Sequence, residues 1–327
     1  MAALAPRSAQ LYRTMRLIRA FEERALQLVK SGEIVGGIHP YIGEEAVAAG
    51  VCAALRADDL ITSTHRGHGH VLAKGADPSR MLAELCGRAT GLNQGRGGSM
   101  HAADVGAGIL GANAIVGGAA PIAAGAAWAA KHTGAGRVVV TFFGDGALNQ
   151  GVLLETMNIA ALWRLPMVFV CENNGYATTM ATAGAVAGSA AGRAAAFGLP
   201  SITIDGMDAE AVHAAAARAV ASARSGGGPT LIEAITYRYG PHHTIELRLR
   251  LGYRSEEEIE RWRQRDPLDI EAARIPAAVR DQIDAEVAEI IESAHEFARS
   301  SADPDPAEAL EYLYASGMKG RGGTSDG

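Results

Sequence analysis

The chain has 327 residues, of which 48% are hydrophobic, 20% are charged and 5% are aromatic. This length allows one large domain or two small ones, and the hydrophobic content excludes a disordered tail protein. The net charge of −6 arises from 30 Lys and Arg against 36 Asp and Glu, without a basic block, so we expect no nucleic-acid partner.

The sequence also predicts the cellular compartment of the protein. It has no apolar run long enough to span a membrane, and residues 1–24 acquire charge too early for a signal peptide. We therefore expect a cytoplasmic protein without membrane contact. Cys52, Cys86 and Cys171 lie far apart and lack the spacing of a metal or redox pair, so we interpret them as buried apolar residues.

The first part of the chain predicts helices up to about residue 30 and at 45–56 and 77–86. Asp77 is the expected cap of the last of these, with Pro78 in its first turn. Residues 91–118 contain too much glycine for a helix or a strand, which predicts a long functional loop. An alanine-rich helix is expected next, over about 119–131.

The central part of the chain alternates strands with helices. Short apolar segments predict buried strands at residues 137–143, 167–171, 201–205 and 230–237. Asp208 is the expected cap of the helix after the third strand. This alternation predicts an α/β fold, with a parallel sheet covered by helices on both faces. Beyond it we expect a helical C-terminal region over 255–317 with one long amphipathic helix, and a disordered tail over 318–327.

Two short motifs allow more than one interpretation. Residues 106–111, GAGILG, match the G-x-G-x-x-G pattern of dinucleotide sites, but they lack the flanking strand and helix, which favours a closely packed loop. His65, His68 and His70 suggest a metal site, yet alternate positions of an extended loop face opposite ways, and Arg66 would repel a cation. An anion site made by Arg66 and partly protonated histidines suits the motif better, and a solvated loop is the remaining alternative.

The most informative motif lies in residues 142–179. One strand ends in GDG (144–146) and the next ends in ENN (172–174), so both reach the sheet edge where parallel α/β proteins bind ligands. Asp145 and the side-chain oxygen of Asn174 suit Mg²⁺, and the glycines let backbone amides approach a diphosphate. Each motif alone is typical of a turn, whereas the pair, one apolar helix apart, indicates a metal–diphosphate site.

This block resembles the thiamine-diphosphate signature, which begins with Gly-Asp-Gly and ends with Asn-Asn; the 26 residues from 147 to 172 lie between. The resemblance covers nearly the whole chain and is closest to the alpha subunit of the 2-oxo acid dehydrogenase first component, in the pyruvate and acetoin dehydrogenase branch. GRGGSMH, IVGGAAPIAAGAA and VFVCENNGY look like that family, and LITSTHRGHGH looks most like the acetoin branch. The resemblance implies a thiamine-diphosphate-binding fold and a single domain over residues 1–317.

The resemblance also implies roles for individual residues. Asp145, Asn174 and the backbone carbonyl of Tyr176 would hold Mg²⁺. His39 and His242 match two active-site histidines that stabilise or protonate intermediates and receive the lipoyl arm, work suited to a group that titrates near neutrality. Residues that would bind the cofactor, through its diphosphate or, for Val116, its aminopyrimidine, are His65, Arg66, Val116, Gly144, Gly146, Ala147 and Asn174.

By the same resemblance, this chain holds half of an active site. A beta subunit would supply the glutamate that activates the cofactor, in an assembly of two alpha and two beta chains. Thiamine diphosphate would cleave a carbon–carbon bond of a small 2-oxo acid or acetoin, and the acyl group would pass to the lipoyl acyltransferase component. Two alternatives stay open: a thiamine-diphosphate enzyme that is not coupled to a lipoyl carrier, and a catalytically silent binding partner.

One segment departs from the family pattern. Relatives usually continue after the second active-site histidine with serine or threonine and acidic residues, whereas residues 243–254 read HTIELRLRLGYR. Apolar and charged residues alternate here, which predicts a strand in place of a mobile loop. The departure leaves the substrate, lipoyl-domain docking and any phosphorylation control open, although Arg248 and Arg250 would suit an acidic partner.

Overall fold

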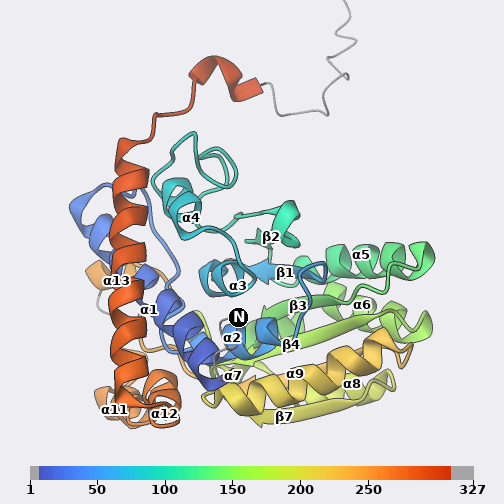
Figure 1. The fold of residues 1–327 in the computed structure, drawn as a ribbon. Coiled ribbons are helices and arrows are strands. Elements are labelled where there is room, and N and C mark those ends of the chain that lie inside the picture. Colours follow the sequence, from blue (N-terminus) through green and yellow to red (C-terminus); the bar gives the residue numbers. More distant parts are fainter. Residues whose placement is uncertain (1–6, 250, 311–327) are drawn as a thin grey trace, which may run out of the picture.

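The fold is built on one parallel sheet. The computed structural model describes residues 7–249 and 251–310, and six strands form a sheet in the order β2-β1-β3-β4-β8-β7, with every neighbouring pair parallel. These strands are β1 (Leu60–Thr64), β2 (Ile109–Asn113), β3 (Val139–Gly144), β4 (Met167–Asn173), β7 (Ser201–Asp205) and β8 (Thr230–Ile235). A small antiparallel pair joins β5 (Tyr176–Ala177) and β6 (Met180–Ala181). Helices cover both faces of the large sheet (Figure 1), which confirms the predicted α/β class.

The central strands are buried along their whole length. In β3 and β4 every residue before the last is buried. Phe142 packs into one hydrophobic cluster and Phe143 into the other, on the opposite face. A parallel sheet with two covered faces therefore needs continuous apolar runs rather than alternation, which is why these strands could be predicted.

The helices divide between the two faces. The first cluster takes residues from α1 (Arg7–Ser31), α2 (Glu45–Ala53), α3 (His68–Ala73), α4 (Pro78–Leu85), α9 (Ala209–Arg224) and α13 (Ala277–Ser300). The second takes residues from α5 (Ala119–Thr133), α6 (Gly151–Leu162) and α8 (Ala190–Ala196). Shorter elements are η1 (Val105–Ala107), η2 (Asp145–Asn149), α7 (Thr182–Ala185), α10 (Glu246–Leu249), α11 (Glu256–Arg263), α12 (Pro267–Ala272) and η3 (Pro306–Leu310).

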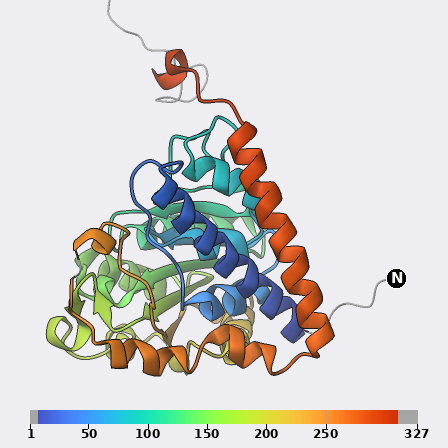
Figure 2. The ribbon, with the colours of Figure 1, turned by 90° about the vertical axis from the view of Figure 1, so that its left-hand side faces the viewer.

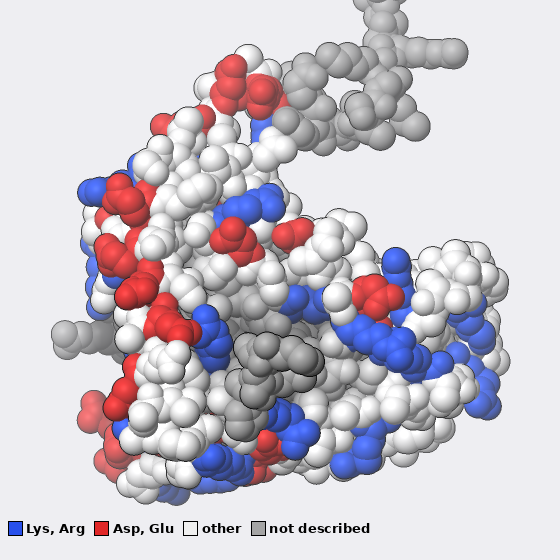
Figure 3. Space-filling model, in the orientation of Figure 1, with Lys and Arg blue, Asp and Glu red and all other residues white. Residues whose placement is uncertain are grey.

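The C-terminal region is helical, as expected, as far as the structure describes it. Figure 2 shows α13 running alongside α1, and it also packs on α4. Its outer side carries exposed acidic residues, among them Asp281, Glu289 and Glu292. Figure 3 shows acidic side chains in a band along the edge of the molecule where α13 lies. The predicted disordered tail lies outside the described residues. None of the described helices is long and apolar enough to cross a membrane.

Several local predictions were right. The caps Asp77 and Asp208 accept hydrogen bonds from the first-turn amides of α4 and α9. Cys52 and Cys171 are buried, and Cys86 is partly buried against the first cluster.

Three local predictions were wrong. The glycine-rich segment 91–118 is not free of regular structure, because residues 109–113 form the edge strand β2. The extended loop expected around His68 and His70 is the short helix α3. The expected strand at 245–251 is replaced by the short helix α10 in its described part.

The last of these errors has a physical cause. The polar residues Thr244 and Glu246 are buried, whereas Ile245, Leu247 and Leu249 are exposed. Thr244 exchanges hydrogen bonds with the backbone of Ile38, and Glu246 accepts one from the backbone of the preceding turn. Hydrogen bonding therefore decides which positions face inward, and the alternation of apolar residues is misleading.

Candidate active site

The carboxyl ends of the central strands form one cavity of about 370 Å³. Parallel register brings Gly144, at the end of β3, beside Glu172 in β4, so the loops that follow the two strands emerge together. The cavity is lined by all eleven residues for which the sequence predicts a site role: His39, His65, Arg66, Val116, Gly144, Asp145, Gly146, Ala147, Asn174, Tyr176 and His242.

Asp145 begins η2 directly after β3 and is only 1% exposed. Burial raises the pKa of its carboxyl to about 6, although the amides of Asp145 and Gly146 and the charge of Arg238 act in the opposite direction. The hydroxyl of Thr182 donates a hydrogen bond to this carboxylate. Asp145 is thus a buried acid whose charge is poorly compensated, which suits a cation ligand.

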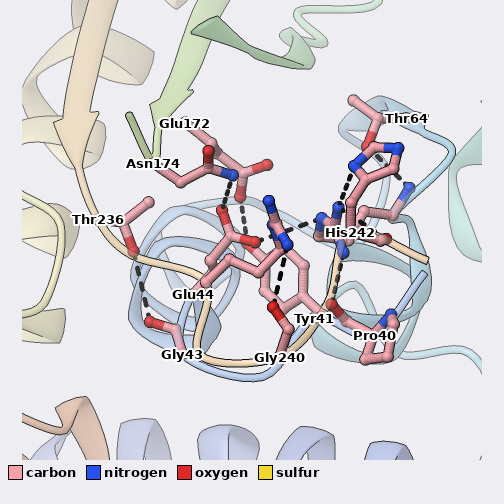
Figure 4. Close-up of polar contacts among 12 residues, drawn as sticks. Pro40, Tyr41, Gly43, Glu44, Thr64, Glu172, Asn174, Thr236, Gly240 and His242 are labelled. Carbon is pink, nitrogen blue, oxygen red and sulfur yellow. Dashed lines mark hydrogen bonds and ion pairs between the residues drawn. The ribbon is translucent and has the colours of Figure 1, made fainter. Parts of the chain in front are cut away.

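Asn174 lines the cavity from the loop after β4. Its Oδ1 accepts a hydrogen bond from the amide of Tyr176 at 3.1 Å, and its Nδ2 donates to Glu44 Oε1 at 3.1 Å. Figure 4 shows the side-chain amide directed at Glu44. The amide oxygen is therefore turned away from Glu44.

Gly146 is needed for close packing beside Asp145. A Cβ at this position would lie 2.9 Å from the Cβ of Ala177. A side chain here would push against Ala177 in the short β5–β6 pair, so packing within the chain already requires glycine at this position.

Arg66 supplies the positive charge of the cavity. Its guanidinium is almost fully buried and donates to the Pro40 carbonyl at 2.7 Å and to the carbonyl and Nδ1 of His242 at 3.2 and 3.1 Å. Glu44 Oε2 lies 3.4 Å from its Nε. Burial lowers the pKa of Arg66 to about 10, with Glu44 opposing, so the guanidinium stays charged at neutral pH.

A cluster of four histidines lies beside Arg66. The ring of His39 is 4.6 Å from that of His65, 4.9 Å from His242 and 4.7 Å from His243, measured between centroids. Burial and the charge of Arg66 lower the pKa of His65 and of His242 to about 3, and they lower that of His39 further. These imidazoles are therefore neutral at pH 7, which corrects the expectation of partly protonated histidines that titrate near neutrality.

The nitrogens of His39, His65 and His242 lie within 4.8 Å of one another, close enough to be considered for a metal. Arg66 argues against it, because its guanidinium donates to Nδ1 of His242 and its charge repels a cation. Since arginine only donates, His242 Nδ1 must accept, and the ring proton lies on Nε2.

The other two histidines of the THRGHGH motif are fully buried and do not line the cavity. His68 pairs with Glu22 at 3.0 Å and with Ser99 at 2.9 Å. His70 pairs with Ser63 at 2.8 Å and with Glu172 at 2.9 Å. The solvated-loop alternative for this motif is therefore wrong.

The sequence did not single out several polar residues of the cavity region, among them Glu44, Glu172 and Thr182. Glu44 and Glu172 line the cavity, and Thr182 binds Asp145 from α7. Burial raises the pKa of Glu44 to about 7, while Arg66 and the Asn174 hydrogen bond lower it. The available signal for Glu172 was its place in ENN at a strand end; Glu44 and Thr182 had no local signal, since their partners lie far away in sequence.

Comparison with known proteins supports this picture. Residues 13–307 match the family model described as the dehydrogenase E1 component. The chain is 46% identical over 316 residues to the alpha subunit of acetoin:2,6-dichlorophenolindophenol oxidoreductase from Bacillus subtilis, covering 95% of this chain and 94% of the relative. It is 45% identical over 314 residues to the same subunit from Cupriavidus necator, covering 94% and 93%.

Pyruvate dehydrogenases are similar as well. The E1 component subunit alpha of pyruvate dehydrogenase from Rhizobium meliloti is 42% identical over 305 residues, which cover 91% of this chain and 87% of the relative. The resemblance stated from the motifs is thereby confirmed. The chain belongs to the dehydrogenase E1 component family of thiamine-diphosphate-dependent oxidoreductases.

Proposed function

We propose that this chain is the alpha subunit of an enzyme that oxidatively cleaves a small 2-oxo acid or acetoin and passes the acyl group to a lipoyl carrier. The observation that carries the proposal is the single cavity lined by all eleven residues that the family resemblance singles out. They come from six separate parts of the chain, so local sequence similarity alone would not require them to meet. The acetoin and pyruvate relatives favour these two substrate classes.

The donor set fits a magnesium–diphosphate group. Asp145 offers a buried carboxylate, Asn174 offers an amide oxygen and Tyr176 a backbone carbonyl, all hard oxygen ligands of the kind that Mg²⁺ prefers. Arg66 would pair with the diphosphate. Residues that would complete the cofactor contacts are His65, Val116, Gly144, Gly146 and Ala147.

His39 and His242 would act on the substrate as neutral imidazoles. His39 has a buried Nδ1 that finds no hydrogen-bond partner within residues 7–249 and 251–310, and His242 carries its proton on Nε2. A neutral imidazole can donate from one nitrogen and accept at the other, so either ring can hold a proton at a substrate oxygen. Thiamine diphosphate, when bound, supplies the carbon nucleophile that the side chains of the protein lack.

A beta subunit is the proposed partner, in an assembly of two alpha and two beta chains, with the lipoyl acyltransferase as acceptor. An exposed apolar surface supports a large interface. It is formed by α5 and α6, which pack on each other, and its side chains are Ile122, Trp128, Ile159, Leu162 and Trp163. Helix α6 is thus only half buried. Exposed apolar surface of this kind commonly marks a site where another protein binds.

The test is reconstitution with the beta chain. Co-purified alpha and beta chains should bind thiamine diphosphate in calorimetric titration only when Mg²⁺ is present, and they should acylate a lipoyl domain from pyruvate or acetoin. The alpha chain alone should show negligible turnover, because the activating glutamate is expected from the partner. Turnover with a dye acceptor but none with a lipoyl domain would favour an enzyme without a lipoyl carrier, and absence of cofactor binding would favour a silent binding partner.

Two further predictions go with this proposal. A single domain is expected over residues 1–317, and limited proteolysis of the assembled protein should release no stable fragment within it. The cytoplasmic location expected from the sequence is to be checked by cell fractionation.

A further inference from the structure

Glu44 lies next to the proposed metal site but does not perform the usual task of its position. It is the residue before α2, where Asp, Asn, Ser and Thr commonly cap the first turn, and its longer carboxylate makes no capping hydrogen bond. Instead it is 1% exposed and lines the cavity. Burying a carboxylate is costly unless its oxygens have partners, so these partners matter.

The partners of Glu44 are one proposed metal ligand and one proposed diphosphate ligand. Oε1 accepts a hydrogen bond from Asn174 Nδ2 at 3.1 Å. Oε2 lies 3.4 Å from Arg66 Nε and has no hydrogen bond of its own among the described residues. One carboxylate therefore contacts both residues, and Figure 4 shows its hydrogen bond with Asn174.

This contact determines how Asn174 is turned. The oxygen and nitrogen of an amide group occupy similar space, so the hydrogen-bond partners decide its orientation. The ionised form of Glu44, which pairs with Arg66, can only accept hydrogen bonds and thus selects Nδ2. The Oδ1 of Asn174 is left for the opposite side, where it meets the amide of Tyr176.

We propose that Glu44 is a positioning residue, which holds the amide oxygen of Asn174 toward the divalent cation. The inference rests on the proposed function, because it concerns the same magnesium–diphosphate site. The neighbouring Glu45 has different partners. Its carboxylate accepts hydrogen bonds from the guanidinium of Arg19 at 2.5 and 3.1 Å and from the amide of Gly43 at 2.9 Å.

The experiment uses the assembled alpha and beta chains with saturating thiamine diphosphate at pH 8. Mn²⁺ replaces Mg²⁺ as the probe, and electron paramagnetic resonance of free Mn²⁺ gives the dissociation constant without reference to activity. Glu44→Gln keeps the shape but can bind Asn174 in either orientation, so the dissociation constant should rise by about 10- to 100-fold, as for other residues behind a metal ligand. Glu45→Gln, the matched control, should change it by less than about twofold, because Glu45 contacts neither ligand.

A double-mutant cycle identifies the route of the effect. In an Asn174→Ala background, measured at higher Mn²⁺, Glu44→Gln should have almost no further effect if Glu44 acts through Asn174. A loss of charge that acts directly on the cation would persist in that background and would overturn the proposal. Should the Gln variant fail to assemble, Glu44→Asp, which keeps the charge but withdraws it by one methylene, takes its place in the same cycle.

The outcomes separate this inference from the proposed function. Wild-type protein that binds Mn²⁺ and thiamine diphosphate at one site, while Glu44→Gln binds them equally well, overturns only the role of Glu44. An equal loss in Glu44→Gln and Glu45→Gln overturns it too. Wild-type protein that binds neither ligand overturns the proposed function and this inference together.

Discussion

Two buried aspartates lie at opposite ends of the same sheet and differ in how well they are paired. Asp59 precedes β1 at the amino ends of the strands, and it accepts hydrogen bonds from Arg224 at 2.9 and 2.7 Å and from the amides of Val138 and Arg56 at 2.8 Å. Burial would raise the pKa of Asp59, but these donors outweigh it and lower the pKa. At the carboxyl ends, burial dominates and raises the pKa of Asp145 to about 6.

This difference in pairing indicates that Asp59 has a structural role and that Asp145 has a role in binding. Asp59 has enough donors to be stable as an ion, so it stabilises the start of β1 and β3. Asp145 accepts hydrogen bonds from neutral donors but makes no ion pair among the described residues, and a buried acid of this kind at a cavity is typical of a binding site whose ligand brings the missing charge. Burial alone therefore does not identify a functional carboxylate, whereas burial without a cationic partner does.

The largest expected effect is that of replacing Asp145, the buried aspartate without a cationic partner in the described part of the chain. Asp145→Asn should weaken Mg²⁺-dependent binding of thiamine diphosphate by more than the ~10–100-fold of an outer-shell change, because it removes the only carboxylate proposed as a ligand. The fold should survive, since no ion pair is lost. Calorimetric titration of the assembled protein measures the affinity, and circular dichroism measures the fold.

A matched control for this variant is Asp205→Asn. Asp205 also ends a strand, β7, but it pairs with Arg265 on the surface and does not line the cavity. Its replacement should leave cofactor affinity unchanged. If Asp145→Asn bound the cofactor with wild-type affinity, Asp145 would not be a metal ligand. Its raised pKa would then not identify a functional residue.

The next effect concerns chemistry rather than cofactor binding. His242→Ala should lower acyl transfer to a lipoyl domain by ~10²–10⁴-fold, the usual loss for a general acid or base, while cofactor affinity changes little. Single-turnover acylation monitors the transfer. The control is His295→Ala, which replaces a histidine of α13 that does not line the cavity. This variant should leave the rate of acyl transfer unchanged. An unchanged rate in His242→Ala would exclude this residue from the reaction.

The paired aspartate should affect stability and leave cofactor binding alone. Asp59→Asn should lower the free energy of unfolding by about 2–4 kcal/mol, because Arg224 loses its buried counter-charge. Denaturant titration measures this loss. Cofactor affinity of the folded protein should equal that of wild type, and a clear reduction would show that the two ends of the sheet are coupled.

The same aspartate predicts a pH dependence. Its pKa is lower in the folded chain than in the unfolded chain, so its stabilisation is present at neutral pH and is lost as pH falls below about 4 through the folded value. The stability difference between wild type and Asp59→Asn should therefore shrink between pH 7 and pH 3. A difference that stays constant over this range would show that the ion pair with Arg224 does not contribute.

The sequence predicts strands β3, β4, β7 and β8 but not β1 or β2, and it predicts one side of the cavity better than the other. Asp145 and Asn174 follow predicted strands, and parallel strands bring their carboxyl ends together, so this side follows from local pattern and topology. His39 and His242 are about 200 residues apart in sequence and meet only through tertiary packing. The resemblance to a family could name them, but no periodicity or spacing could.

The strand β2 and the neutral state of the cavity histidines were not predicted from the sequence, and each has a physical explanation. Strand β2 contains Gly111 with a φ of 146°, a conformation that only glycine adopts easily, and its pairing with β1 shifts register at Ile61. Glycine in this segment therefore permits an irregular edge strand rather than preventing one. The neutral state of the histidines depends on their burial beside Arg66, which composition does not reveal.

The smallest expected effect concerns the segment after His242, where exposed apolar side chains and Arg248 lie on or beside α10. Replacing the exposed Arg248, together with Arg250, which lies outside the described residues, by Ala should slow association with an acidic lipoyl domain by a few-fold at low salt and flatten its salt dependence, because charges steer encounter but add little to the final contact. Arg263→Ala on α11, another exposed arginine, is the matched control. Stopped-flow acylation at two ionic strengths measures the rate. Because the expected strand is a short helix with its apolar side chains exposed, an unchanged rate would mean that those side chains, rather than the arginines, make the contact, and Leu247→Ser would then be the variant that slows it.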